Sequence, residues 1–471
     1  ESLARFNQEE GLKRPLAIQI GIHTGIVIAG PLGPGDTREY SIMGEPVELA
    51  LQLKDASPQG EITVGASNNR YTRNEFDYQE LKPLVPTEKR EPIPVYRLLS
   101  ARARVYRARL GSERMIFSEM VGRSRELDKL KLHVLKAING EGSIVNIIGE
   151  AGIGKSRLIA ELAQQDETKR VNFLIGRALS FGQNLSFHPL IDILKSWAGI
   201  AEDDTPISSS QKLELAIRNV YPEGVAEVFP FIATLMGIKI AGRDAERVEA
   251  VAGESLEKLI MKNLRELIVK AAASRPIAFV VEDLHWADLS SIELLSSLYR
   301  LAENNRILFI NVFRPNYEET SERLLRTIRT RYPKLASDIC LEPLDDNQCE
   351  TLVDNLLHTK DLPDHIMELI TKRAEGNPFF IEEVARSFID DGVVEKKNGH
   401  FYVTEKIDSV IIPETVHDVI MARVDKLDEQ TKSLLKIASV IGRYFFYSIL
   451  TEVAKSVAEI DDKLEYLKEV Q

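Results

Sequence analysis

Between residues 143 and 313, short apolar runs alternate with stretches of helical periodicity. Continuous apolar runs of this length are typical of strands buried on both faces. Strands that alternate with helices favour a parallel sheet flanked by helices, and loops after such strands meet at one sheet edge, where ligands bind. The runs predict strands in Ser143–Ile148, Val171–Ile175, Ile277–Val281 and Ile307–Val312.

The first hundred residues show a different pattern. Two β-rich runs surround a turn in Ala17–Gly30, a second turn follows in Pro31–Asp36, and helical spacing appears in Val47–Leu53. This mixture predicts an α+β segment. Further short strands are predicted in Glu39–Met43, Gly60–Val64 and Pro94–Leu98.

Three stretches connect or interrupt these regions. Ala101–Arg114 is rich in arginine without apolar periodicity, which favours a linker or solvated helix over a basic nucleic-acid patch. An amphipathic helix follows, with Leu127, Leu130, Val134 and Ile138 on one face. Asp203–Ala252 contains helical patterns at Gln211–Asn219 and Ala226–Met236 between sheet strands, and we expect an inserted helical lid.

The last third is mainly helical. A Gly376-Asn377-Pro378 turn ends one helix and restarts the next, because glycine suits a helix end and proline suits a first turn. Asn398-Gly399 between two β-rich runs predicts a hairpin in Gly392–Val403, and a hairpin among helices suggests a winged helix. Helices are predicted in Asp345–Leu357, Ile366–Arg373, Phe379–Phe388 and from Pro413 onward.

The residues best suited to bind a ligand directly follow the first predicted strand of the parallel sheet. Gly149-Glu150-Ala151-Gly152-Ile153-Gly154-Lys155-Ser156 matches the G-x-x-x-x-G-K-[ST] phosphate loop between a strand and a helix. Glycines permit positive φ, so successive N–H groups can face phosphate oxygens, and the helix adds its positive end. We expect nucleotide contacts from Gly149, Gly152, Gly154, Lys155, Ser156 and Arg157, with Lys155 on the β- and γ-phosphates and the Ser156 hydroxyl on Mg²⁺.

Two acids, Glu282 and Asp283, follow the third predicted sheet strand. Acids at the end of a buried strand suit Mg²⁺ coordination and the orientation of an attacking water. We assign the metal role to Glu282 and the water-orienting role to Asp283, although the two can be exchanged. Arg314 follows the fourth strand, where a cation can read a γ-phosphate or form a surface salt bridge.

Composition narrows the function classes. The net charge of −12 argues against indiscriminate nucleic-acid binding and an anionic membrane partner. No apolar run approaches a bilayer span, and two cysteines without metal-ligand company fit a reducing cytoplasm. The start, Glu1-Ser2-Leu3, lacks an initiator Met, which suggests a cut inside a longer protein.

The segment from Ile20 to Leu53 resembles the back half of a class III adenylate/guanylate cyclase homology domain. The shared features are Ile20-Gly21-Ile22-His23-Thr24-Gly25 and Glu39-Tyr40-Ser41-Ile42-Met43-Gly44-Glu45-Pro46. The resemblance places Ser41 at the purine, but Glu48 and Gln52 stand where the family carries Asn and Arg. A carboxylate repels triphosphate and Gln52 has no guanidinium fork, so a regulatory or dimerising relic is favoured over an active cyclase half. We interpret His23 as a core or turn residue.

The middle of the chain resembles the signal-transduction P-loop ATPases with numerous domains. That resemblance implies that Val121-Gly122-Arg123 lies beside adenine and that Glu282-Asp283-Leu284-His285-Trp286-Ala287-Asp288 is a Walker B motif. It also implies a sensor role for Arg314. Pro378 is a candidate nucleotide-state sensor, with ordinary helix capping as the alternative, while His285 and Trp286 are interpreted as structural.

The sequence therefore predicts an α/β chain: an α+β cyclase-type half domain, a P-loop NTPase parallel sheet with flanking helices, then helical and winged-helix modules. The predicted boundaries are 1–100 for the cyclase-like domain, 101–115 for the linker, 116–342 for the ATPase, 343–408 for the helical domain and 409–471 for a winged helix.

The favoured function is an ATP-binding, slowly hydrolysing signalling switch that uses ATP and Mg²⁺ and contacts other protein domains or subunits. One alternative is a cyclase making cyclic AMP once a front half or partner completes it. Another is an ATP-regulated winged-helix transcription factor. Residues 411–471 carry eight Lys or Arg and eleven Asp or Glu, a net charge of −3, which disfavours DNA binding.

Overall fold

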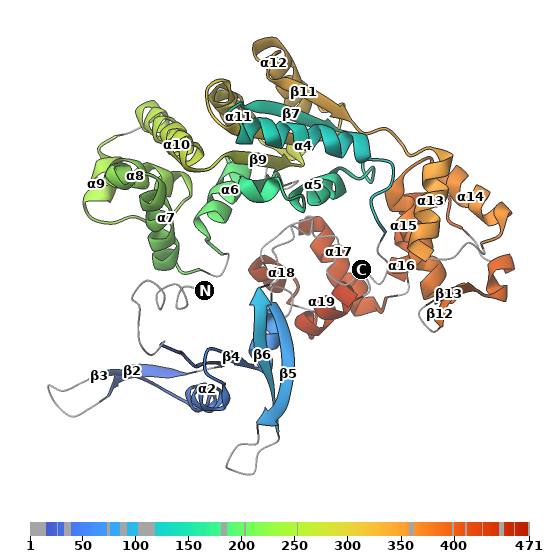
Figure 1. Ribbon diagram of the computed structural model, residues 1–471, viewed down its shortest axis with the longest axis horizontal. Coiled ribbons are helices and arrows are strands. Elements are labelled where there is room, and N and C mark those ends of the chain that lie inside the picture. The colour runs from blue at the N-terminus through green and yellow to red at the C-terminus, as the bar shows by residue number, and fades with distance from the viewer. Residues whose placement is uncertain are drawn as a thin grey trace. The chain divides into compact units, whose positions relative to one another are not determined.

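A computed structural model describes most of the chain as two compact units, divided between Arg107 and Ala108 (Figure 1). The architecture is mixed α/β with a parallel sheet in the second unit, which confirms the predicted fold class. The described residues are 16–25, 27–32, 39–72, 76–84, 92–101, 118–179, 186–201, 204–251, 253–357, 362–397, 400–409, 412–425, 427–441, 447–455 and 457–469.

The first unit contains a four-stranded sheet ordered β1-β4-β6-β5. β1 and β4 are parallel, whereas β6 is antiparallel to β4 and β5. Helix α2 packs so tightly on β1 that a Cβ at Gly21 would lie 2.2 Å from the carbonyl oxygen of Ala50. The elements are β1 (Ile20–Ile22), β2 (Ile28–Leu32), β3 (Glu39–Met43), α2 (Glu45–Ala56), β4 (Ile62–Gly65), α3 (Ala66–Thr72), β5 (Phe76–Leu84) and β6 (Ile93–Ala101).

This arrangement confirms the predicted α+β character and corrects one detail. β2 pairs with β3 as an antiparallel hairpin and includes Pro31 and Leu32, which we had placed in a turn; residues 33–36 of that turn lie outside the described residues. The arginines predicted to form the linker, Arg102 to Arg114, also lie outside them.

The second unit is built on a five-stranded parallel sheet ordered β11-β7-β10-β9-β8. All four predicted strands are present, and the strand that precedes the phosphate loop is separated by one strand from the strand that ends in the two acids. A fifth strand, β11, was not predicted. The strands are β7 (Ser143–Ile148), β8 (Asn172–Arg177), β9 (Ile277–Glu282), β10 (Ile307–Phe313) and β11 (Ala336–Cys340).

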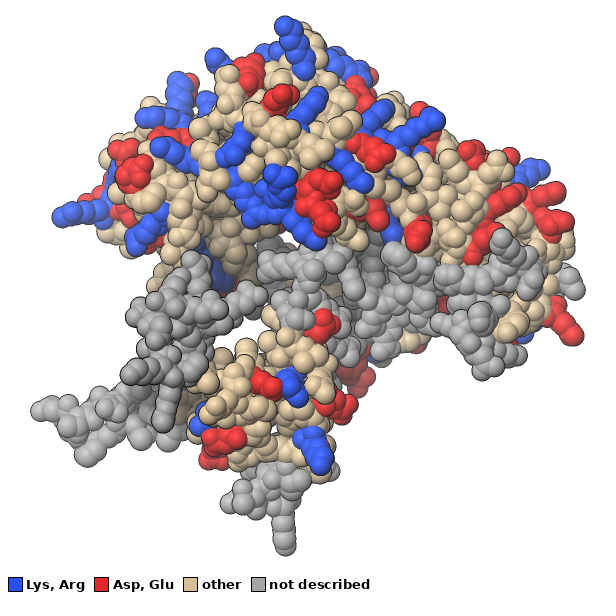
Figure 2. Space-filling model, viewed as in Figure 1, with Lys and Arg blue, Asp and Glu red and all other residues tan. Residues whose placement is uncertain are grey.

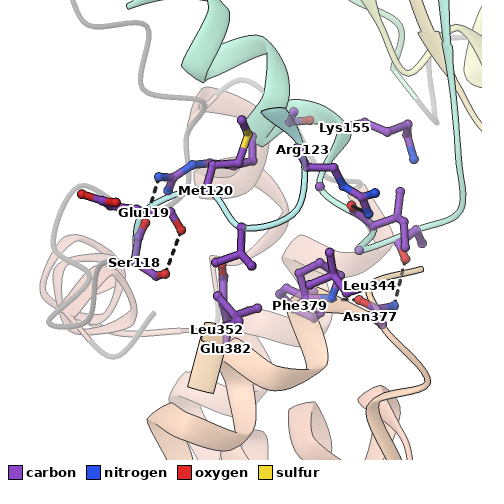
Figure 3. Close-up of a pocket in the computed structure, with 18 of the residues that line it drawn as sticks. Ser118, Glu119, Met120, Arg123, Lys155, Leu344, Leu352, Asn377, Phe379 and Glu382 are labelled. Carbon is purple, nitrogen blue, oxygen red and sulfur yellow. Dashed lines mark hydrogen bonds between the residues drawn. The ribbon is translucent and has the colours of Figure 1, made fainter. Parts of the chain in front are cut away.

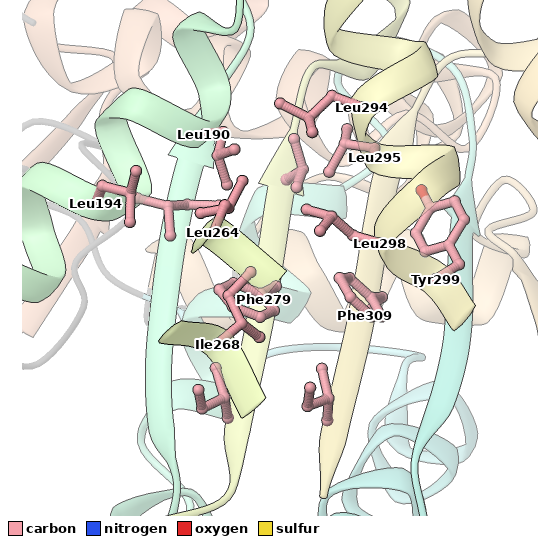
Figure 4. Packing of buried hydrophobic residues seen from close by; sticks show 14 of the residues in the cluster. Leu190, Leu194, Leu264, Ile268, Phe279, Leu294, Leu295, Leu298, Tyr299 and Phe309 are labelled. Atoms are coloured by element: carbon pink, nitrogen blue, oxygen red, sulfur yellow. The ribbon is translucent and has the colours of Figure 1, made fainter. Parts of the chain in front are cut away.

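Helices cover both faces of this sheet, which explains the continuous apolar runs. Phe279 and Phe309 stack with ring centroids 5.4 Å apart and pack, with Tyr299, under α6, α10 and α11 (Figure 4). Helix α4 packs against β7, β9 and β10, with α5 beside it. The helices are α4 (Ser124–Ile138), α5 (Lys155–Ala163), α6 (His188–Ala198), α10 (Glu254–Ser274), α11 (Leu289–Leu298) and α12 (Arg323–Arg331).

The predicted insertion is helical, with α7 (Pro206–Val220), α8 (Val225–Leu235) and α9 (Arg243–Glu249). Its buried side chains, including Leu213, Ile217 and Ile232, join the same core as the sheet. Among the described residues, no residue of 203–252 lines the cavity discussed below. The insertion is therefore helical as predicted, but its described residues extend the core of the sheet and do not cover the cavity as a lid would.

The region after the sheet forms a second core from α13 (Asp346–Leu357), α14 (Asp364–Ala374) and α15 (Pro378–Asp390). The predicted hairpin is present as β12 (Val394–Lys397) and β13 (His400–Val403); its Asn398-Gly399 loop lies outside the described residues. Val394, Ile407 and Ile412 are buried in this core. The hairpin therefore packs with the helical domain, and the predicted boundary at 408/409 falls inside one hydrophobic core.

Helix α16 (Val416–Asp425) also attaches to α15, because the Arg423 guanidinium pairs with the buried Glu383 carboxylate at 2.5 Å. The last helices, α17 (Glu429–Ile441), α18 (Tyr447–Val453) and α19 (Ile460–Glu469), share a separate small core around Leu434 and Leu450. Within the described part of the chain, no helix is both long and apolar enough to cross a membrane.

Candidate functional site

The phosphate loop follows β7 directly and ends where α5 begins. Gly152 and Gly154 have φ of 79° and 101°, a left-handed conformation that glycine adopts without steric cost. A Cβ at Gly149 would lie 2.8 Å from the Ile153 side chain. These positions require glycine, and a loop of this shape at a helix N-terminus can accept an anion.

Two basic side chains of α5 brace the loop. The Lys155 ammonium donates to the carbonyl oxygens of Gly149 and Glu150, both at 2.7 Å. The Arg157 guanidinium donates to the carbonyl oxygen of Ser118 at 3.0 Å and pairs with Glu161 at 3.5 Å. The Lys155 ammonium therefore lies against the loop backbone, while its contact with phosphates stays a prediction, and Arg157 holds the segment that precedes α4.

The two acids after β9 have different environments. Glu282 is 3% exposed, and its carboxylate accepts from the Arg177 guanidinium of β8 at 2.9 Å. Asp283 adopts a left-handed φ of 56° and lines the cavity beside the phosphate loop. Glu282 does not line that cavity in the described residues. The structure thus separates two carboxylates that the sequence alone left interchangeable.

Arg314 follows β10 and lines the same cavity, so the ends of β7, β9 and β10 converge as predicted. Its backbone N–H donates to His285 Nδ1 at 3.4 Å. The His285 ring is buried and lies 4.9 Å from the ring of Tyr317 and 5.1 Å from that of Trp286. His285 and Trp286 are packing residues here, and His285 helps to fix the strand end that carries Arg314.

The turn before α15 reaches the phosphate loop from the opposite wall. Asn377 caps α15 by accepting from the Phe379 N–H at 3.1 Å, and its side-chain amide donates to the Ala151 carbonyl oxygen at 3.1 Å. A Cβ at Gly152 would lie 2.6 Å from Asn377 Oδ1. Pro378 lines the cavity as expected. The helical domain therefore contacts the loop backbone directly.

A strap formed by Ser118–Arg123 closes a third side. The Arg123 side chain is buried and donates to the carbonyl oxygens of Ile153 at 3.4 Å and Glu342 at 2.5 Å. Burial lowers the pKa of this guanidinium, opposed by the nearby Glu126 and Glu342 carboxylates. Arg123 thus joins the strap, the phosphate loop and the chain that leads into the helical domain.

These walls enclose a cavity of about 450 Å³, the size of many small-molecule sites (Figure 3). Sequence reasoning missed the residues that the helical domain contributes beyond Pro378, because their position depends on tertiary packing. A helical signal existed for one of them: Glu382 follows Pro378 by four positions, which places both on one helix face. The missed residues are Leu344, Leu352, Asn377, Phe379 and Glu382.

The candidate residues of the first unit lie on and around α2. Glu48 is exposed and Gln52 is half-buried one turn later on the same helix. The imidazole of His23 lies against Gly65, where a Cβ would be 2.4 Å from Nδ1. The backbone of Ser41 belongs to β3, but its side chain lies outside the described residues. His23 is thus a packed turn residue, as interpreted from the sequence.

Comparison with known proteins assigns both units. Residues 1–98 match the family described as the adenylate and guanylate cyclase catalytic domain, and residues 119–310 match the AAA ATPase domain. The chain joins a cyclase-type segment to an AAA-type P-loop ATPase. Residues 345–401, which include the helical wall of the cavity, match a domain of unknown function.

Two curated relatives cover most of this chain. An uncharacterized protein of Rhizobium meliloti (strain 1021) is 25% identical over 82% of the chain and 36% of its own length. Adenylate cyclase type 10 of Rattus norvegicus is 20% identical over 93% of the chain and 29% of its own length. The chain thus spans about a third of the length of each of these relatives.

A similar solved structure is a signal transduction ATPase with numerous domains from Pyrococcus horikoshii, which carries a tetratricopeptide repeat sensor. It is 13% identical over 76% of this chain and 40% of that chain, with a TM-score of 0.39. The family comparisons find the same two kinds of domain that the sequence resembles, a cyclase domain and a P-loop ATPase domain.

Proposed function

We propose that the second unit binds ATP with Mg²⁺, hydrolyses it slowly, and uses the nucleotide state to set how the helical domain packs on the sheet. One observation carries this proposal. The cavity combines a phosphate loop, an acid and an arginine from three neighbouring strand ends with the Asn377–Phe379 turn from the opposite wall. An AAA ATPase domain is a nucleotide-hydrolysing type of domain, which agrees with this arrangement.

The residues present suit a magnesium nucleotide. Lys155 supplies a cation above a loop whose glycines leave room for an anion, and Ser156 and Asp283 present oxygen atoms at the cavity. Mg²⁺ prefers one or two protein oxygens together with phosphates. Bound Mg²⁺ would neutralise charge on the phosphates during hydrolysis. Among the described residues, no preformed cluster of metal-binding side chains exists, so the phosphates must complete the site.

The environments of the two acids favour giving both the metal role and the water-orienting role to Asp283. Asp283 faces the cavity and is proposed to serve the metal and the attacking water. Glu282 is proposed to position that strand end through its buried pair with Arg177. Arg314 is proposed to bind the γ-phosphate, because its half-buried side chain lines the cavity and no salt bridge competes for it among the described residues.

The switch follows from what holds the two walls together. Asn377 donates to the phosphate loop, and Arg123 donates both to that loop and to the Glu342 carbonyl at the entry to the helical domain. A nucleotide bound in the loop thus contacts groups that also hold the helical domain. The free energy with which the helical domain packs on the sheet would therefore differ between the ATP-bound and ADP-bound states.

The cyclase-type unit is proposed to be catalytically degenerate. Glu48 and Gln52 share one face of α2 and supply no cation for phosphate. Its partners, and those of the whole chain, are proposed to be protein domains. The net charge of −12 and the mixture of Lys and Arg with Asp and Glu on the face shown in Figure 2 support this over a nucleic-acid partner.

The experiment that tests the proposal is ATP binding by the Lys155→Ala variant, measured by calorimetry with Mg²⁺. Loss of a charged donor is expected to weaken binding by about 100-fold. Lys169→Ala is the matched control, because Lys169 is exposed and pairs only locally with Asp166 at 2.7 Å. Equal affinity in the wild type and Lys155→Ala would remove the proposal.

A further inference from the structure

The cavity has two chemically different ends. The sheet side carries Lys155, Ser156, Asp283 and Arg314, which suit phosphate and metal. The side formed by the strap and the helical domain is mainly apolar, with Met120, Val121, Leu344, Leu352 and Phe379. Figure 3 shows Lys155 on one side and Leu352, Phe379 and Glu382 on the helices opposite. The apolar side chains fit a base, and the polar lining residues on the same side, among them Glu119, Asn377 and Glu382, are candidates to bind the hydroxyls of a sugar.

Glu382 is the charged side chain that the helical domain contributes to this cavity, among the described residues. It lies on α15 four positions after Pro378, and residues four apart share a helix face, so both point into the cavity. The next residue, Glu383, points away and is buried against Arg423 at 2.5 Å. Glu383 is therefore tied to α16, whereas Glu382 lines the cavity.

The distance of Glu382 from the phosphate loop follows from helix geometry. The start of α15 is fixed at the loop, because Asn377 donates to Ala151. Four helical residues advance about 6 Å along the axis. Glu382 therefore lies about 6 Å further along α15 than the turn that contacts the loop, and its carboxylate would repel phosphates. Ionised carboxylates only accept hydrogen bonds, and the two ribose hydroxyls are donors.

We propose that Glu382 binds the ribose of the nucleotide by accepting hydrogen bonds from its 2′- and 3′-hydroxyls, so that the site selects ribonucleotides over deoxyribonucleotides. This assignment rests on the proposed function, since it concerns the sugar of the same ATP. It deepens that function by naming the substrate class as ribonucleoside triphosphates and by giving the helical domain a direct hold on the ligand.

The test measures the affinities of the full chain for ATP, 2′-deoxyATP and 3′-deoxyATP with Mg²⁺, in the wild type and in Glu382→Ala. A hydrogen bond to a charged acceptor is worth enough for the wild type to bind ATP about tenfold more tightly than either deoxynucleotide. In Glu382→Ala we expect this ratio to fall to within about twofold, mainly through weaker ATP binding. Glu382→Gln keeps the shape and one acceptor oxygen, so an intermediate ratio is expected.

Glu368→Gln is the matched control, because it removes one exposed acid from α14 of the same helical domain without touching the cavity. Equal wild-type affinity for the three nucleotides would overturn the assignment, even if every Glu382 variant failed to fold. Equal weakening of all three in Glu382→Ala would also overturn it, as a structural effect. If the wild type binds all three nucleotides with equal affinity, only the assignment to Glu382 is wrong. If it binds none of them, the proposed function is wrong as well.

Discussion

The two units of this chain both match nucleotide-handling domain families, yet they differ in charge where phosphate is expected. In the second unit, Lys155 and Arg314 converge on a cavity at the end of a parallel sheet. In the first unit, the face of α2 where the cyclase family carries Asn and Arg presents Glu48 and Gln52. If the first unit is degenerate as proposed, the comparison teaches that a cyclase-type fold can persist after its cationic phosphate-binding side chain is lost.

The largest effect expected within the second unit is on hydrolysis in Asp283→Asn. Removing the cavity-facing carboxylate should lower kcat by about 1,000-fold, because it loses a group that orients the attacking water. ATP affinity should change far less. Single-turnover hydrolysis with radiolabelled ATP measures the first quantity, and calorimetry the second.

Glu282→Gln is the comparison variant. It leaves the cavity lining intact but breaks the buried pair with Arg177, so it should lower the free energy of unfolding by about 3 kcal/mol. Urea denaturation checks this. If Glu282→Gln abolished hydrolysis in folded protein while Asp283→Asn kept it, the roles proposed here for the two acids would be wrong.

A smaller effect is expected from Gly152→Ala, which tests whether the helical wall and the phosphate loop fit closely. The added Cβ would meet Asn377 Oδ1 at 2.6 Å, and the left-handed φ of 79° disfavours alanine. We expect ATP affinity to fall by about tenfold. Gly140→Ala is the control, because it also has positive φ but open space around its Cβ. An equal loss in Gly140→Ala would show that backbone strain alone is responsible.

The smallest effect is expected in the first unit. Replacing Glu48 by Gln and Gln52 by Leu together should change the ATP affinity of the chain by less than about twofold, since no cation is lost there. Calorimetry against the wild type measures this. A tenfold change would mean that the cyclase-type unit contributes to binding, and the contrast between the units would no longer hold.

Much of the sheet could be predicted because its strands are buried on both faces and read as unbroken apolar runs. The edge strand β11 could not, since Ala336-Ser337-Asp338-Ile339-Cys340 mixes apolar residues with Ser337 and Asp338 and forms no continuous apolar run. Asp338 instead accepts from Asn146 at 2.8 Å and pairs with Arg329 at 2.7 Å. Such partners exist only after folding, so no local pattern reveals that strand.

The residues of the candidate site also fall into those that the sequence could predict and those that it could not. Gly149 to Ser156 could be predicted, because spacing along one loop fixes its chemistry. The environments of Glu282 and Asp283 could not, since they depend on Arg177, about a hundred positions earlier in the chain. Glu382 depends on where α15 packs against the loop. Sequence thus predicts groups that lie close along the chain, while tertiary packing selects among them.

The most direct test of where ATP lies is photolabelling of the full chain with 8-azidoATP and Mg²⁺, followed by peptide mapping. The account predicts label in peptides of the second unit that contain Ser118–Arg123 or the helical wall between Leu344 and Glu382, and its loss in Lys155→Ala. Label confined to residues 16–101, or label unaffected by Lys155→Ala, would contradict it.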